Sequence, residues 1–257
     1  PLYVYEGTPD ERESGQRGLA FGERSRELNR RDGISDDALT HFKAAYPGER
    51  ITKEDIFYYV YGLLHSTEYR ERYADNLGKE LPRIPCVKGI DAFRAFSEAG
   101  RALAKLHLHY DEVPPFKATI ESSGKLKASD YRVEKMRFGK GRDGSKDRSI
   151  IEYNERIVVR DIPLEAYEYV VNGKSAIEWV MERQGVRTDK DSGIVNDSNA
   201  YALETAKNAR YPLELLLRVI TVSLETMKIV RSLPALEIEQ TPAPSPKPVA
   251  VQQSLLA

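Results

Sequence analysis

The chain has 257 residues, an apolar content of 40% and a formal net charge of -1. This length and composition allow one substantial hydrophobic core, or one core and a smaller module. The balanced charge excludes a uniformly basic nucleic-acid-binding protein, so contact with DNA would have to come from a local patch.

Cysteine usage and hydropathy indicate the cellular compartment. The single cysteine, Cys86, excludes an intrachain disulfide and a thiolate metal cage. No apolar run approaches the roughly 18 residues that span a bilayer, and no signal segment opens the chain. We therefore expect a cytoplasmic protein without membrane contact. Because residue 1 is proline rather than methionine, we also expect a fragment of a longer polypeptide.

The first 49 residues are the least regular part of the sequence. Residues 11–33 mix arginines with acidic residues, a balance that suits an exposed linker. A short helix is expected over 35–46, because Ser35 can cap it and acidic residues occupy its first turn.

Helical spacing begins clearly at Thr52. Thr52 stands three residues before Asp55, a near match to a capping box, and apolar residues follow at helical spacing. Further helical segments are expected over 66–77, where Ser66 can act as the cap, and over 89–110. These segments predict a helical subdomain.

The sequence period changes from helical to alternating near residue 114. Short runs of β-branched and aromatic residues at 131–139, 149–154 and 156–162 predict strands. We expect a small, mostly antiparallel sheet over 114–162.

The sequence predicts further helices after the sheet. We expect a short helix near 166–171, a break at Asn172, and a new helix capped by Ser175 with Glu178 closing a capping box. Residues 186–202 are expected to form a long polar loop.

The last predicted helix begins with Pro212 in its first turn and ends before Pro234. Residues 237–257 are rich in proline, lack aromatic residues and are expected to be disordered. The predicted fold class is therefore α+β: a helical subdomain plus a small mostly antiparallel sheet with C-terminal helices packed on it.

The loop between the first two predicted strands carries an excess of positive charge. From Arg132 to Arg148 the sequence has seven basic and three acidic residues, a local charge of +4. Two interpretations stay open: a polyanion-binding loop, or an ordinary solvated hairpin turn.

The usual catalytic motifs are absent from this sequence. Residues 172–176 resemble the end of a phosphate-binding loop, but Glu168 stands where that loop needs a glycine. No Glu-x-Lys or Asp-x-Lys tripeptide of a metal-dependent nuclease occurs, and His107 and His109 point to different faces of a helix. We expect no catalytic site, no bound metal and no cofactor in this chain.

A resemblance to a known family is carried by four segments in order: "EDIFYYVYGLLHSTEYRERYADNLGKELPRIP", "AFRAFSEAGRALAKLHL", "YRVEKMRF" and "YEYVVNGKSAIEWVMERQGVRTDKDSGIVND". Together they resemble the C-terminal specificity region of type ISP restriction-modification enzymes, over roughly residues 1–236. The final "EQTPAPSPKPVAVQQSLLA" departs from that pattern.

The resemblance implies the place of this chain in a larger enzyme. Such enzymes join a nuclease, an ATP-driven translocase, an adenine N6-methyltransferase and a target-recognition domain in one polypeptide. Residues 1–49 would be the trailing edge of the methyltransferase domain and a linker, 50–236 the DNA target-recognition domain, and 237–257 a disordered tail. S-adenosylmethionine, ATP and magnesium are expected only in the upstream methyltransferase and translocase domains, which would be this chain's partners together with double-stranded DNA.

A target-recognition domain has to display polar loops on a rigid core, so that some side chains reach base edges while others hold phosphates. Two predicted loops of this chain suit that purpose. The candidate DNA-binding residues of the basic loop are Lys135, Arg137, Lys140, Arg142, Lys146 and Arg148. The candidates after Trp179 are Arg183, Arg187, Lys190, Asn196 and Asn199.

Residue type suggests how these candidates divide between bases and phosphates. Arginine pairs with guanine and asparagine with adenine, so Arg137 and Asn196 are the predicted base readers. Lys140 and Lys146 are the predicted phosphate contacts. Which residue reads which base stays open, and Lys135 and Arg137 could instead line the solvent face of a sheet.

Two other functional classes remain as alternatives. The first is a protein-interaction scaffold in which the aromatic helix at 56–64 docks a partner domain and the basic loop is incidental. The second, which we rank lowest, is a catalytic module with an unfamiliar site.

Overall fold

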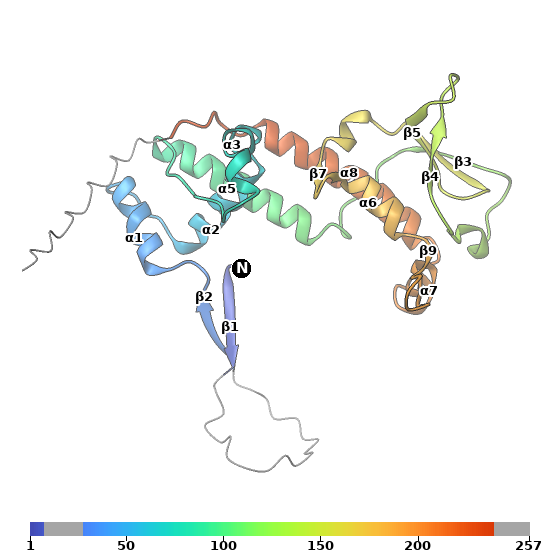
Figure 1. The fold of residues 1–257 in the computed structure, drawn as a ribbon, viewed down its shortest axis with the longest axis horizontal. Coiled ribbons are helices and arrows are strands. Elements are labelled where there is room, and N and C mark those ends of the chain that lie inside the picture. The colour runs from blue at the N-terminus through green and yellow to red at the C-terminus, as the bar shows by residue number, and fades with distance from the viewer. Residues whose placement is uncertain (8–27, 239–257) are drawn as a thin grey trace, which may run out of the picture.

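The computed structural model describes residues 1–7 and 28–238. Figure 1 shows an elongated molecule with a helical end, a sheet end and the long helix α8 extending between them. The linker expected over 11–33 and the disordered tail expected over 237–257 fall largely outside the described residues. The observed fold class is α+β, which confirms the prediction.

The helical end is built from short strands and helices that follow in chain order. Their bounds are β1 Tyr3–Gly7, β2 Leu28–Asp32, α1 Asp36–Ala45, α2 Lys53–His65, α3 Thr67–Arg72, α4 Ala74–Leu77 and α5 Ile90–Leu108. The predicted caps are confirmed: Ser35 accepts a hydrogen bond from the Ala38 amide, and Thr52 and Asp55 form a complete capping box.

The core of the helical end is aromatic and tightly packed. The rings of Tyr59 on α2 and Phe93 on α5 stack with centroids 4.8 Å apart, and both side chains are buried. The two helices also meet through backbone: a Cβ built on Gly100 would lie 1.8 Å from the Tyr58 carbonyl oxygen. Ile56, Tyr59 and Leu63 are buried in this core and are not available to the partner domain of the scaffold hypothesis, whereas Phe57 and Tyr58 of the same helix are half-buried.

The sheet end contains a single four-stranded antiparallel sheet. The strands β3 Thr119–Ser122, β4 Arg137–Lys140, β5 Lys146–Glu152 and β6 Ile157–Arg160 have the spatial order β3-β6-β5-β4. One face of this sheet packs on α6 Ala176–Arg183 and on the first half of α8 Tyr211–Arg231, as Figure 1 shows. The predicted antiparallel sheet with C-terminal helices packed on it is thereby confirmed.

The strand expected over 131–139 is shorter than predicted. Residues Ala128–Tyr131 form a 3-10 helix, and β4 begins only at Arg137. The intervening backbone is bonded elsewhere: Val133 pairs with the Asn199 side chain, and the Glu134 carbonyl accepts from the Val186 amide. These hydrogen bonds replace the strand-to-strand hydrogen bonds that the predicted strand would have formed.

The prediction of a polar loop over 186–202 is wrong. Two short strands, β9 Val186–Thr188 and β10 Val195–Asp197, form an antiparallel hairpin, and α7 Ser198–Glu204 follows at once. The turn is organised by Asp189, whose carboxylate accepts hydrogen bonds from the Asp191 and Ser192 amides. The short helix expected near 166–171 is likewise reduced to a 3-10 turn, η2 Leu164–Tyr167, followed by the two-residue strands β7 Val170–Val171 and β8 Lys174–Ser175.

The helix α8 joins the two ends of the molecule. Its first half packs under the sheet, while Thr226 in its second half hydrogen-bonds His107 Nε2 on α5 at 2.9 Å. The other ring nitrogen of His107 lies 2.8 Å from the Tyr61 hydroxyl of α2. Burial of the ring lowers the pKa of His107 to about 4.

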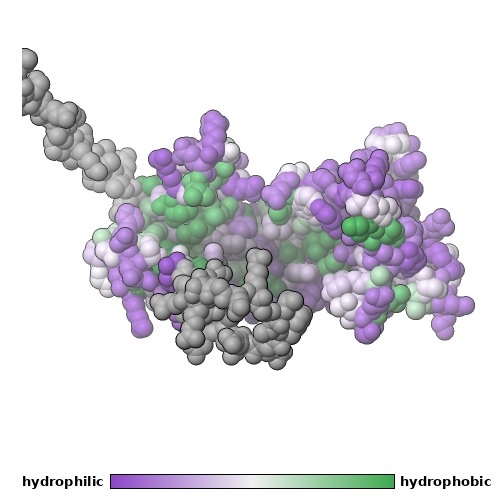
Figure 2. Space-filling model, turned by 60° about the horizontal axis from the view of Figure 1, so that its bottom comes forward, coloured by the Kyte–Doolittle hydropathy of each residue, from purple (hydrophilic) through white to green (hydrophobic). Residues whose placement is uncertain are grey.

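The two ends differ in surface character. On the face in Figure 2, hydrophobic side chains gather over the helical end, whereas hydrophilic side chains cover most of the sheet end. Among the described residues, no helix is both long and apolar enough to cross a membrane.

Candidate nucleic-acid interface

The β4–β5 hairpin carries the basic loop at its tip. Gly144 has a φ of 79°, which favours glycine, and Asp143 accepts hydrogen bonds from the amide and hydroxyl of Ser145. Lys140 and Lys146 face each other across the two strands. Like charges in directly opposite positions destabilise a hairpin, so this pair fits a site that an anion neutralises.

The β9–β10 hairpin carries the second group of candidates. Arg187 and Asn196 are directly opposite each other in the strand register, and both side chains are exposed. Arg183, at the end of α6, lines the same surface hollow as these two residues. Arg187 and Asn196, which are nine positions apart in sequence, are thus adjacent on one face of the hairpin.

Asn199 holds the two hairpins together. Its side chain is 5% exposed, and its amide exchanges two hydrogen bonds with the backbone of Val133, at 2.9 and 2.8 Å. The assignment of Asn199 as a DNA contact is therefore wrong, because the side chain is buried and its hydrogen-bonding groups are already paired. Instead, Asn199 fixes the start of α7 against the segment that leads into β4.

Two further contacts strengthen this connection. Arg132 lies 3.1 Å from Asp197 and also pairs with Glu134. Burial would raise the pKa of Asp197, but the hydrogen bonds from Asn199 and Arg132 outweigh it and hold that pKa below its usual range. Gly185 is needed here as well, since an added Cβ would lie 2.5 Å from the Glu134 carbonyl oxygen.

Three adjacent surface hollows connect the two hairpins. Their volumes are about 470, 510 and 580 Å³. The first and second share Lys135 and Arg137, and the second and third share Glu182. We call this continuous surface the recessed strip. Its predicted candidates are Lys135, Arg137, Lys140, Lys146, Arg183, Arg187 and Asn196.

The remaining candidates lie outside the recessed strip. Arg142 and Lys190 are exposed in the turns of the two hairpins. Arg148 lies over the rings of Phe138 and Tyr167, at 5.9 and 5.6 Å, and pairs with Glu178 at 3.5 Å. These contacts give Arg148 a packing role within the sheet end. Its side chain is nevertheless 51% exposed, so its contact with DNA stays a prediction.

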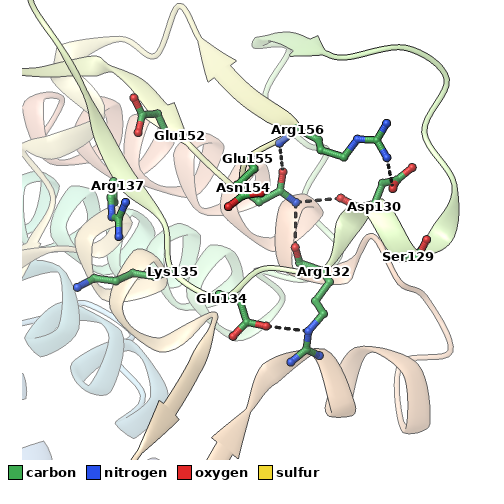
Figure 3. A pocket seen from close by; sticks show the side chains of 10 residues that line it. All are labelled: Ser129, Asp130, Arg132, Glu134, Lys135, Arg137, Glu152, Asn154, Glu155 and Arg156. Carbon is green, nitrogen blue, oxygen red and sulfur yellow. Dashed lines mark hydrogen bonds and ion pairs between the residues drawn. The ribbon is translucent and has the colours of Figure 1, made fainter.

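Several polar groups of the first hollow are paired with one another, as Figure 3 shows. Arg156 forms an ion pair with Asp130 at 2.6 Å, and Arg132 with Glu134 at 2.8 Å. The Asn154 amide donates to two backbone carbonyls and accepts from two backbone amides.

Sequence reasoning missed two features of this surface. Glu152, on β5, lines the first hollow, and the only signal for it is its outward position in the strand alternation. The connection through Asn199 has no local signal, because Val133 is 66 positions away.

The fold and the recessed strip define a class of protein: an α+β recognition module that displays two polar hairpins on a rigid core. The family model for the Type ISP C-terminal specificity domain matches residues 1–215, and the chain belongs to this family. The resemblance inferred from the sequence is confirmed.

Solved structures of related enzymes are similar over most of the chain. The ATP-dependent Type ISP restriction-modification enzyme LlaBIII bound to DNA is 35% identical, with a TM-score of 0.74 over 93% of this chain. A nuclease-deletion mutant of the Type ISP enzyme LlaGI, in complex with a DNA substrate mimic, is 45% identical with a TM-score of 0.64 over 75%. The DrdV–DNA complex is 32% identical with a TM-score of 0.68 over 80%.

The similarity extends over only a small part of those proteins. The chain covers 14%, 17% and 20% of the LlaBIII, LlaGI and DrdV chains, respectively. No curated protein matches the chain.

Proposed function

We propose that this chain recognises a specific sequence in duplex DNA through the recessed strip, as the specificity domain of a larger Type ISP restriction-modification enzyme. One observation carries this proposal: Asn199 and Arg132 dock two hairpins so that basic side chains distant in sequence line one continuous surface. DNA complexes of the similar proteins LlaBIII, LlaGI and DrdV support it.

The residues of this surface divide into two roles. Lys140, Arg142 and Lys146 surround the tip of the β4–β5 hairpin, where flexible cations suit phosphate oxygens. Arg137, Arg187 and Asn196 lie inside the strip on short strands, a rigid setting that suits contact with base edges in the major groove. Phosphate contacts would hold the register while the strand residues read sequence.

The catalytic activities belong, in this proposal, to upstream domains of the same polypeptide. Those domains would bind S-adenosylmethionine, ATP and magnesium. The assignments of residues 1–49 to the end of a methyltransferase domain and a linker, and of 50–236 to target recognition, stay predictions, as does a cytoplasmic location. This chain would contribute specificity alone.

Binding of a fluorescent duplex, measured by anisotropy at low and moderate salt, tests the proposal. We expect weak binding that falls steeply with salt, because neutralised phosphates release counterions. The triple variant Lys140→Ala, Arg142→Ala, Lys146→Ala should bind much more weakly. A matched control removes the same charge at the helical end, through Lys43→Ala, Arg50→Ala and Lys79→Ala, all exposed positions.

The two variants separate the possible outcomes. Loss of binding in the hairpin variant alone supports recognition by the sheet end. Equal loss in both variants would show that only the net charge matters, and no binding of the wild type at low salt would refute the proposed function.

A further inference from the structure

The first hollow of the recessed strip contains four charged groups that its internal pairing leaves free. Lys135, Arg137, Glu152 and Glu155 line it, are exposed, and form no ion pair within the described part of the chain. In Figure 3 the dashed lines join other residues of the hollow, and none reaches these four side chains. This hollow therefore offers donors and acceptors to a ligand.

Arg137 and Glu152 are placed to act on one ligand. They are direct partners in the register of β4 and β5, so their side chains leave the sheet on the same face. Opposite charges at such positions usually pair, yet no contact within 4.0 Å joins their charged atoms in the described structure. The pairing register shifts next to this pair, between Phe138 and Gly139, with the unpaired residues on β5. Such irregularities are a common device for aiming a side chain.

The carboxylate of Glu152 decides which kind of ligand fits. A phosphate group offers only acceptor oxygens and negative charge, so a free carboxylate beside it would be repelled. A base-pair edge in the major groove offers both kinds of group. In a G·C pair, guanine presents the acceptors N7 and O6, and cytosine presents the N4 amino group as a donor.

We infer that Arg137 and Glu152 together read one G·C base pair, Arg137 donating to guanine N7 and O6 and Glu152 accepting from cytosine N4. The inference rests on the proposed function and names the base pair that this part of the strip selects. Lys135 extends from the same side of the chain as Arg137 in Figure 3, and it would reach a neighbouring phosphate.

Selection from a random duplex library tests this inference. The full chain is incubated with the library at low salt, bound duplexes are sequenced, and the procedure is repeated with Arg137→Ala and Glu152→Gln. The wild type should enrich a motif that contains a G·C pair, and both variants should lose preference at that same pair by about tenfold or more. Preferences elsewhere in the motif should persist.

Glu155→Gln is the matched control. Glu155 is an exposed carboxylate that lines the same hollow, but it lies in the β5–β6 turn and not opposite Arg137. This variant changes the charge by the same amount as Glu152→Gln and should leave the motif intact.

The outcomes distinguish the inference from the proposed function. A wild type that enriches no motif would overturn both. A wild-type motif that Glu152→Gln leaves unchanged would overturn only the pairing of Arg137 with Glu152. If the two variants lose base preference at an A·T pair, or at different positions from each other, the assignment to one G·C pair is overturned.

Discussion

The substitution Asn199→Ala tests the connection between the two hairpins. It removes the side chain that accepts from the Val133 amide at 2.9 Å and donates to the Val133 carbonyl at 2.8 Å. Val133 is fully buried, so both of its backbone groups lose their partners inside the core. A third hydrogen bond, to Asp197, disappears as well.

The expected magnitude follows from these lost partners. Each unsatisfied buried backbone group costs about 1 to 2 kcal/mol, which gives about 2 to 4 kcal/mol for the pair. Asn199 also lines a hollow of about 370 Å³, so water can reach part of the site. We therefore expect the free energy of unfolding to fall by about 2 kcal/mol, at the lower end of that range.

Urea unfolding followed by circular dichroism measures this change. Asn196→Ala is the control, because Asn196 is exposed on the neighbouring strand β10 and its loss should change stability by less than about 0.5 kcal/mol. If Asn199→Ala is no less stable than this control, the role that we assign to Asn199 is wrong.

Three further predictions follow from the geometry. Lys140→Ala should lower the slope of log affinity for duplex DNA against log salt by about one unit, without loss of stability, in titrations at several salt concentrations. Gly100→Ala should lower the melting temperature strongly, because its Cβ would lie 1.8 Å from the Tyr58 carbonyl oxygen, whereas Gly78→Ala meets no atom within 4 Å and should change little. The pKa of His107 is lowered to about 4, so its contribution to stability is full above pH 6.5 and is lost as the pH falls toward 4. The melting temperature of His107→Gln should therefore depend less on pH over that interval than that of the wild type.

Local signals in the sequence identified most of the helices correctly. The capping boxes at Thr52 and Ser175 are confirmed in the structure, because a cap depends on residues three positions apart and is visible in a short window. The basic hairpin between two strands was predicted for the same reason: alternation and turn residues are local.

The candidate site depended on contacts that are distant in sequence. The sequence predicts a loop at 186–197, because the strands of this hairpin are only three residues long and flank a polar turn. Residue type alone predicts that Asn199 contacts DNA, whereas tertiary packing gives its side chain the partner Val133. The role that we infer for Glu152 depends on the strand register, which places this residue opposite Arg137 and cannot be read from the sequence.

Lysine footprinting tests most directly whether duplex DNA occupies the recessed strip. The chain is acetylated briefly with and without duplex at low salt, and the modified lysines are quantified by mass spectrometry. DNA should protect Lys135, Lys140 and Lys146, while Lys105 on α5 and Lys228 on α8, which are exposed outside the strip, should react equally in both samples. Protection of Lys105 and Lys228 with continued reaction of the three strip lysines would contradict the account.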